Sequence, residues 1–129
     1  MKVIINTDGA SKGNPGISSI GAIIKNEKGV MLAGISRRIG RMTNNQAEYR
    51  AIIAALERAL EIEAGSVQLY SDSELVVKQI KGYYHVKKDA LKVLHRRVID
   101  LIDKFDGFDI KHIARSKNKE ADRLANKAL

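Results

Sequence analysis

Four acidic residues lie in local patterns that ordinary surface charge explains poorly. Two directly follow apolar, strand-like runs and two lie in the early turns of predicted helices; they are Asp8 and Asp72, then Glu48 and Asp122. Carboxylates gathered in one place repel each other unless cations join them, and their oxygens suit hard ions such as Mg²⁺ or Mn²⁺. The pattern therefore predicts a site for divalent metal.

Such a site could hydrolyse a phosphodiester bond. Two Mg²⁺ ions about 3.5–4 Å apart stabilise both the attacking and the leaving oxygen of an in-line displacement at phosphorus. Four carboxylates would neutralise much of the charge of the ions and leave positions for water and phosphate. For each acid alone, helix capping or an interaction with the helix dipole is the alternative, and it fits Asp72 and Asp122 well.

The charge balance of the chain favours a polyanionic partner. The chain has 129 residues, a net charge of +8 and no cysteine that could form a disulfide or a thiolate metal site. A positive excess of this size favours nucleic acid, although many small intracellular proteins are also basic. No apolar run reaches the roughly 18 residues of a membrane-spanning helix. We expect a single domain over residues 1–129, a cytoplasmic location, no membrane association and no obligate protein partner.

The apolar periodicity predicts an α/β fold in the order β-β-β-α-β-α-α-β-α. The predicted strands cover residues 2–7, 20–25, 30–39, 67–70 and 108–114, and residues 8–16 are a predicted glycine-rich loop. Two predicted helices begin with capping boxes, at Thr43 with Gln46 and at Ser71 with Glu74, and two more cover residues 91–105 and 119–129. A meander followed by alternating strands and helices indicates a five-stranded mixed sheet with helices on its faces.

This order predicts that the four acids lie close together. Asp8 is expected to close the first strand, and Asp72 follows the fourth. If these strands are parallel neighbours, as a helical crossover implies, both carboxylates emerge at the same end of the sheet. Glu48 and Asp122 each lie about one turn into a helix and can converge on the same place.

At these residues the chain resembles the type 1 ribonuclease H family. The matching fragments run in order through nearly the whole chain, at residues 7–11, 13–16, 43–48, 71–73 and 118–125. The resemblance implies a ribonuclease H-like fold and endonucleolytic cleavage of the RNA strand of RNA/DNA hybrids, with 5′-phosphate and 3′-hydroxyl products. It also implies that Asp8, Glu48, Asp72 and Asp122 hold two Mg²⁺ ions, for which Mn²⁺ can substitute.

The resemblance further implies a set of substrate contacts. Family members contact the RNA strand through a Gly-Asn-Pro-Gly loop and paired asparagines, roles that fall on Gly13, Asn14, Asn44 and Asn45. Glycine lets the backbone approach a sugar closely, and asparagine offers a donor and an acceptor to a 2′-hydroxyl. Turn formation and helix capping are the alternative roles of these asparagines. Ser71, Lys87 and Lys88 complete the predicted contacts.

One departure from the family concerns the loop before the last acid. Many members carry a histidine there that assists proton transfer or product release, and some use arginine. His112 lies ten residues before Asp122, and Arg115 is placed further into the loop. A histidine can shuttle a proton near neutral pH, whereas an arginine can only position phosphate or water. The sequence leaves both residues as candidates.

A second departure concerns the basic helix and loop that bind the DNA strand in some members. Only residues 81–88 remain of that region, and Lys81, Lys87 and Lys88, with Lys92, Arg96 or Arg97, could replace part of it. Tyr83 and Tyr84 could stack on sugar or base, or the segment could be a solvated turn with one buried tyrosine. Two rival functions are another nuclease on the same scaffold and a non-catalytic binder. The RNA-reading loop argues against the first, and the intact acids argue against the second.

Overall fold

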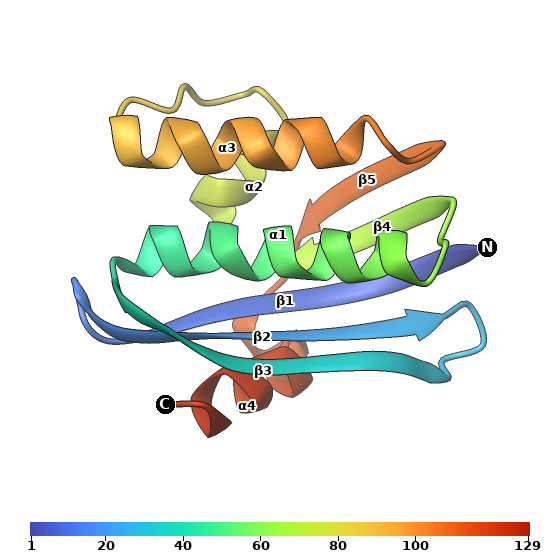
Figure 1. Cartoon of the computed structure of the whole chain (residues 1–129), viewed down its shortest axis with the longest axis horizontal. Coiled ribbons are helices and arrows are strands. Elements are labelled where there is room, and N and C mark those ends of the chain that lie inside the picture. The colour runs from blue at the N-terminus through green and yellow to red at the C-terminus, as the bar shows by residue number, and fades with distance from the viewer.

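A five-stranded mixed sheet forms the centre of the molecule (Figure 1). The computed structural model describes residues 1–129. In chain order the elements are β1 (Lys2–Gly13), β2 (Gly16–Asn26), β3 (Met31–Met42), α1 (Asn44–Glu61), β4 (Ser66–Ser71), α2 (Glu74–Ile80), α3 (Asp89–Ile102), β5 (Gly107–His112), a 3₁₀ turn at Arg115–Lys117 and α4 (Lys119–Lys127). The strands lie in the order β3-β2-β1-β4-β5. The predicted fold class and element order are confirmed.

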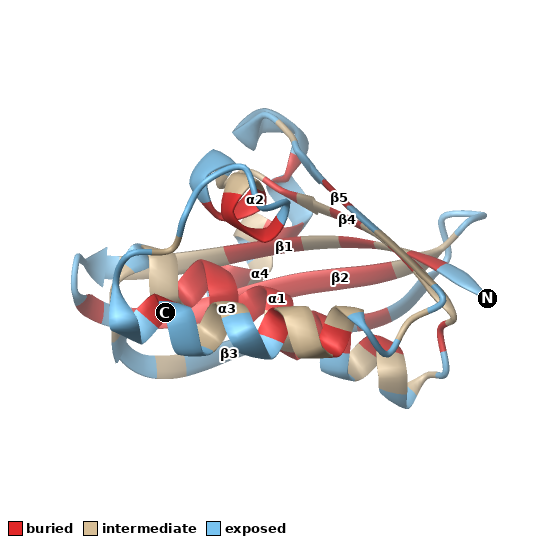
Figure 2. Ribbon diagram, turned by 90° about the horizontal axis from the view of Figure 1, so that it is seen from above, coloured by how far each residue is buried: buried red, intermediate tan, exposed pale blue.

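Helices cover the two faces of the sheet unequally. Figure 1 shows α1 and α3 stacked on one face and α4 alone on the other. The main core lies between the sheet and α1, where Figure 2 shows most of the buried residues. Helix α1 turns a row of small side chains toward the sheet, among them Ala47, Ala51 and Ala55, so that the helix approaches β1 closely. None of the helices is long and apolar enough to span a membrane.

The hairpin of β1 and β2 is much longer than predicted. The predicted loop at residues 8–16 is wrong, because β1 continues to Gly13 and pairs with β2 as far as Gly16. Glycine and aspartate have low strand propensity, but pairing with the buried strand β2 makes residues 8–13 part of β1, and only Asn14 and Pro15 form a turn. Strand β3 likewise extends to Met42 and not to residue 39.

The two predicted capping boxes have different outcomes. The box of Thr43 and Gln46 at α1 is confirmed by both of its hydrogen bonds. The box of Ser71 and Glu74 is wrong, because Ser73 is the residue that caps α2. Ser71 belongs to the end of β4, and its hydroxyl accepts a hydrogen bond from the Ser73 N–H at 3.1 Å.

Helix α4 is attached to the sheet mainly by small residues and hydrogen bonds. Its buried side chains are only alanines. A Cβ on Gly21 of β2 would collide with the α4 backbone, which shows how closely the helix approaches the sheet. The Ser19 hydroxyl donates to the Ala125 carbonyl, and the Ser36 hydroxyl donates to the Leu124 carbonyl at 2.6 Å. These bonds fix the position of the acid that α4 carries.

The unequal lengths of two neighbouring strands create a notch at the edge of β1. Parallel pairing of β1 with β4 ends where Thr7 faces Ser71. From Asp8 to Gly13, β1 continues with β2 as its only neighbour. The notch is therefore open on the side of β4 and lies between α1 on one face of the sheet and α4 on the other (Figure 1).

Candidate active site

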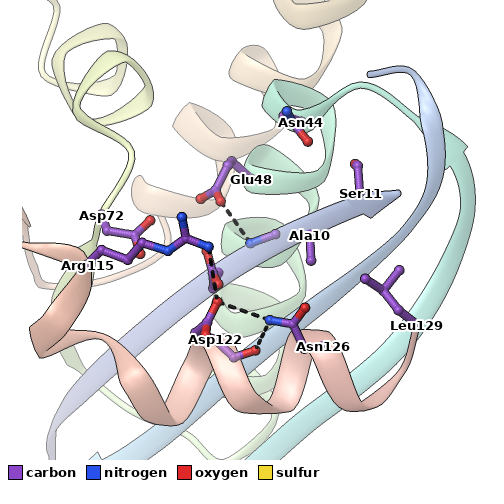
Figure 3. A pocket seen from close by; sticks show the side chains of 11 residues that line it. Ala10, Ser11, Asn44, Glu48, Asp72, Arg115, Asp122, Asn126 and Leu129 are labelled. Atoms are coloured by element: carbon purple, nitrogen blue, oxygen red, sulfur yellow. Dashed lines mark hydrogen bonds and ion pairs between the residues drawn. The ribbon is translucent and has the colours of Figure 1, made fainter. Parts of the chain in front are cut away.

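The four acids meet in this notch. Asp8 lies within β1 and Asp72 directly follows β4, while Glu48 comes from α1 and Asp122 from α4. Carboxylate oxygens of Asp8, Glu48 and Asp72 lie within 4.8 Å of one another. Asp122 lines the same pocket, which has a volume of about 440 Å³ (Figure 3). The expectation that Asp8 closes its strand is wrong, yet the acids still converge because β4 ends here.

Glu48 is held so that one of its oxygens remains free for a ligand. The Gly9 N–H donates to Glu48 Oε1 at 2.9 Å, and a Cβ at Gly9 would collide with the backbone of α1. The other oxygen, Glu48 Oε2, is buried and has no partner in the protein. An unpaired buried carboxylate oxygen is costly, and a divalent cation would satisfy it. The all-oxygen donor set of the notch thus fits a hard divalent metal.

The notch disfavours ionised carboxylates. Burial raises the pKa of Asp8, and the negative charges of Glu48 and Asp72 raise it further. Burial also raises the pKa of Glu48, although the hydrogen bond from Gly9 opposes this shift. Like charges this close cannot all ionise at low cost without a cation between them.

The structure separates the two candidates in the loop before Asp122. Arg115 lines the pocket, and its Nη2 lies 3.9 Å from Asp122 Oδ1. Figure 3 shows the Arg115 side chain reaching between Asp72 and Asp122. His112 ends β5, and its Nδ1 lies 3.8 Å from Glu74 Oε2, outside the residues that line the pocket. The positions of the two side chains therefore favour Arg115 over His112 as the residue of this loop that could contact a bound substrate.

The predicted RNA contacts lie beside the acids. Asn14, at the tip of the β1–β2 hairpin, accepts the Asn44 N–H through its Oδ1 at 3.0 Å, which joins the hairpin to the start of α1. Asn44 is exposed and lines the pocket, and Gly13 is exposed at the hairpin tip. Ser71 differs from them because it is fully buried. Its hydroxyl helps to lower the pKa of the Glu48 carboxyl from inside the protein, so the geometry does not support a direct substrate contact.

The remaining predicted contacts line a separate groove of about 540 Å³. Asn45, Lys87 and Lys88 lie there with Tyr83 and Tyr84. The two tyrosines are 72% and 49% exposed, so the alternative of one buried tyrosine is wrong. This groove joins the start of α1 to the segment between α2 and α3.

Two asparagines near the acids were not assigned a role from the sequence. Asn126 Nδ2 donates to Asp122 Oδ1 at 3.1 Å, and their spacing of one helical turn was an available signal. Asn118 bonds to the Thr7 carbonyl and to Asp72. It directly precedes the predicted helix over residues 119–129, where an asparagine commonly serves as a cap.

Comparison with known proteins identifies the family. The family model described as reverse transcriptase-like matches residues 6–128. Ribonuclease H of Bradyrhizobium diazoefficiens is 33% identical over 98% of this chain and 89% of its own length. The chain belongs to the ribonuclease H family. This confirms the resemblance that the sequence fragments indicated.

Solved structures of the family have the same fold. The RNase H1 of the halophilic archaeon Halobacterium salinarum is 41% identical, with a TM-score of 0.97 over 99% of this chain and 97% of that chain. LC11-RNase H1, crystallised in complex with an RNA/DNA hybrid, is 40% identical, with a TM-score of 0.93 over 98% of this chain and 95% of that chain. The chain spans 61% of the length of Halobacterium ribonuclease HI and 36% of the bifunctional protein Rv2228c of Mycobacterium tuberculosis.

We predict that Asp8→Asn stabilises the metal-free protein increasingly as pH rises. A carboxyl whose pKa is raised by folding contributes stability that is present at low pH and is lost as pH rises through the raised value. Asparagine cannot ionise and escapes this loss. In chelator, the free energy of unfolding of the variant relative to that of wild type should rise by at least about 1 kcal/mol between about pH 4 and pH 8, since one pKa unit corresponds to about 1.4 kcal/mol.

Urea unfolding of both proteins across this pH range measures the difference. Saturating Mg²⁺ provides the internal control, because wild type should then regain the lost stability and the variant should gain less. A constant difference between the two proteins at all pH values would show that Asp8 is not under electrostatic strain.

Proposed function

We propose that this chain is an endonuclease that hydrolyses the RNA strand of RNA/DNA hybrids and leaves 5′-phosphate and 3′-hydroxyl ends. The observation that carries the proposal is the convergence of Asp8, Glu48 and Asp72 within 4.8 Å in a chain of net charge +8. The hybrid bound to LC11-RNase H1, at 40% identity, supports the substrate class. A single domain and a cytoplasmic location remain predictions within the same proposal.

Two Mg²⁺ ions, replaceable by Mn²⁺, are the proposed cofactor, with Asp8, Glu48, Asp72 and Asp122 as ligands. Bound in the notch, they would stabilise the charge that builds up on the scissile phosphate and make a nearby water more acidic. The protein's contribution is to hold the carboxylates in place. Gly9 fixes Glu48 through one oxygen, and Asn126 fixes Asp122.

Arg115 is the proposed contact to the scissile phosphate. Its side chain is 83% exposed and its guanidinium lies beside Asp122 at the pocket, so it can turn toward a bound phosphate without leaving a buried charge unpaired. A guanidinium stays protonated and cannot act as a base, but it can bind phosphate through two parallel N–H groups. His112 faces Glu74, and in this proposal it takes no direct part in the reaction.

The hairpin tip and the start of α1 are the proposed reader of the RNA strand. Asn14 Oδ1 is already occupied by the Asn44 N–H, which leaves the Asn14 amide donors and the whole Asn44 side chain available. Gly13 has a positive φ of 97° and gives the backbone a close approach that a side chain would obstruct. These groups suit a 2′-hydroxyl, which distinguishes RNA from DNA.

The groove between α1 and the α2–α3 segment is the proposed contact for the DNA strand. Lys87 and Lys88 supply positive charge to phosphates, and exposed Tyr83 and Tyr84 supply aromatic faces against which a sugar or base can pack. Asn45 lies in the same groove and links it to the RNA-reading asparagines.

The central test compares cleavage of four labelled duplexes in Mg²⁺. We expect cuts in the RNA strand of the hybrid, with the rate on double-stranded DNA lower by about 100-fold or more, since a site built around a hydroxyl rejects a substrate that lacks it by large factors. Double-stranded RNA and a hybrid with a 2′-deoxy stretch complete the set. Excess chelator should stop the reaction. Equal cutting of DNA, or full activity in chelator, would contradict the proposal.

The roles of Arg115 and His112 can be separated by single-turnover kinetics. Arg115→Ala should slow cleavage by about 100-fold, the low end of the loss on removing one preorganised charge contact. His112→Ala should stay within about threefold of wild type, far below the 10²–10⁴-fold that general acid–base catalysis supplies. The reverse order would assign the catalytic role to His112.

A further inference from the structure

Asn118 is a fully buried polar residue at the start of α4 whose side chain does not cap that helix. It is the N-cap of α4 and is 1% exposed. Asparagine at an N-cap usually accepts a backbone N–H from the first turn of its helix. Asn118 makes no such capping bond. Its side chain bonds instead to β1, which carries Asp8, and to Asp72.

The side chain of Asn118 makes three hydrogen bonds there. Its Nδ2 donates to the Thr7 carbonyl at 2.9 Å and to Asp72 Oδ2 at 3.4 Å. Its Oδ1 accepts from Asn6 Nδ2 at 3.0 Å. Both N–H donors of this primary amide and its oxygen therefore have a partner within the protein. Thr7 directly precedes Asp8 in β1, which links the amide to the backbone of a second acid.

The backbone of Asn118 reaches a third acid. Its carbonyl accepts the Asp122 N–H at 3.1 Å in the first turn of α4. One residue therefore contacts the Asp72 carboxylate, the strand beside Asp8 and the helical turn that carries Asp122. Glu48 belongs to α1, on the other face of the sheet, and is held separately by the N–H of Gly9 in β1.

We propose that Asn118 is a positioning residue that keeps three of the acids at the spacing a divalent cation requires. Carboxylates this close repel each other, and the Asn118 amide holds the Asp72 side chain in place by donating a hydrogen bond to its Oδ2. Its bond to the Thr7 carbonyl sets the distance from α4 to β1. The proposal rests on the proposed metal-dependent function and names a residue that touches neither substrate nor solvent.

Asn118→Ala should weaken metal binding and turnover but not substrate binding. Loss of a group that orients metal ligands typically costs about 10–100-fold in metal affinity or activity. We expect the Mg²⁺ concentration that gives half of the maximal thermal shift to rise about tenfold, and kcat to fall by a similar or larger factor. KM for the hybrid should stay within about twofold at saturating Mg²⁺, because the substitution removes no contact between the protein and the substrate.

Two further variants exclude a merely structural effect. Ser19→Ala removes another buried hydrogen bond to α4, at the Ala125 carbonyl, without touching an acid. It should lower the melting temperature and leave the Mg²⁺ midpoint unchanged. Asn118→Ser is the second variant in case the alanine variant does not fold, because serine is as good an N-cap as asparagine. A serine side chain is too short to bond both Thr7 and Asp72, so the raised Mg²⁺ midpoint should persist.

Thermal melts of chelator-stripped proteins titrated with Mg²⁺ give the metal midpoint without any reference to cleavage. Equal midpoints for wild type and both Asn118 variants would overturn the proposal, as would an equal rise in Ser19→Ala or an effect on KM alone. If no protein cuts the hybrid and the midpoints still shift as expected, the proposed function fails and the positioning role stands. If wild type cuts the hybrid but shows no Mg²⁺-dependent thermal shift, the positioning role fails.

Discussion

Carboxylates that repel one another in a partly buried notch determine how the strands and helices around them must be arranged. Asp8 and Glu48 are buried, Asp72 lies within 4.8 Å of both, and the pKa of each buried acid is raised. A fold that only maximised its own stability would place apolar residues or an arginine there. The cluster is stable with all its carboxylates ionised only if a divalent cation relieves the repulsion. A cation bound there can coordinate a phosphate oxygen of a substrate.

The architecture holds the acids together against this repulsion from both faces of the sheet. Because β4 ends while β1 continues, α1 and α4 can each send an acid around the edge of β1. Gly9 lets α1 approach and donates to Glu48, and Gly21 lets α4 approach from the opposite face. Asn118 bonds the start of α4 to β1 and Asp72. Around the notch, the helices are therefore positioned by close backbone contacts and by the buried Asn118 amide, whereas large apolar side chains position the elements of the main core.

The sequence predicted the elements that rest on strong local signals. Thr43 and Gln46 marked the start of α1, and the four acids followed from their position after strands and at helix starts. It failed where distant contacts decide. Residues 8–16 contain turn-forming types, yet pairing with β2 makes most of them strand. Position in the sequence also could not choose between His112 and Arg115, because the direction of each side chain depends on where β5 ends. The role of Asn118 was hidden because its partners are far away in the chain.

A pH titration followed by ¹³C NMR of the Asp8 and Glu48 carboxyl carbons, with and without Mg²⁺, measures the strain in the notch and its relief by metal. In chelator, the Asp8 carboxyl should titrate far above its ordinary value of 3.8 and show coupling to Glu48. Saturating Mg²⁺ should move both transitions to lower pH, because the cation favours the ionised forms. If both carboxyls titrate in the ordinary range in chelator and Mg²⁺ leaves them unchanged, the notch is neither electrostatically strained nor a metal site.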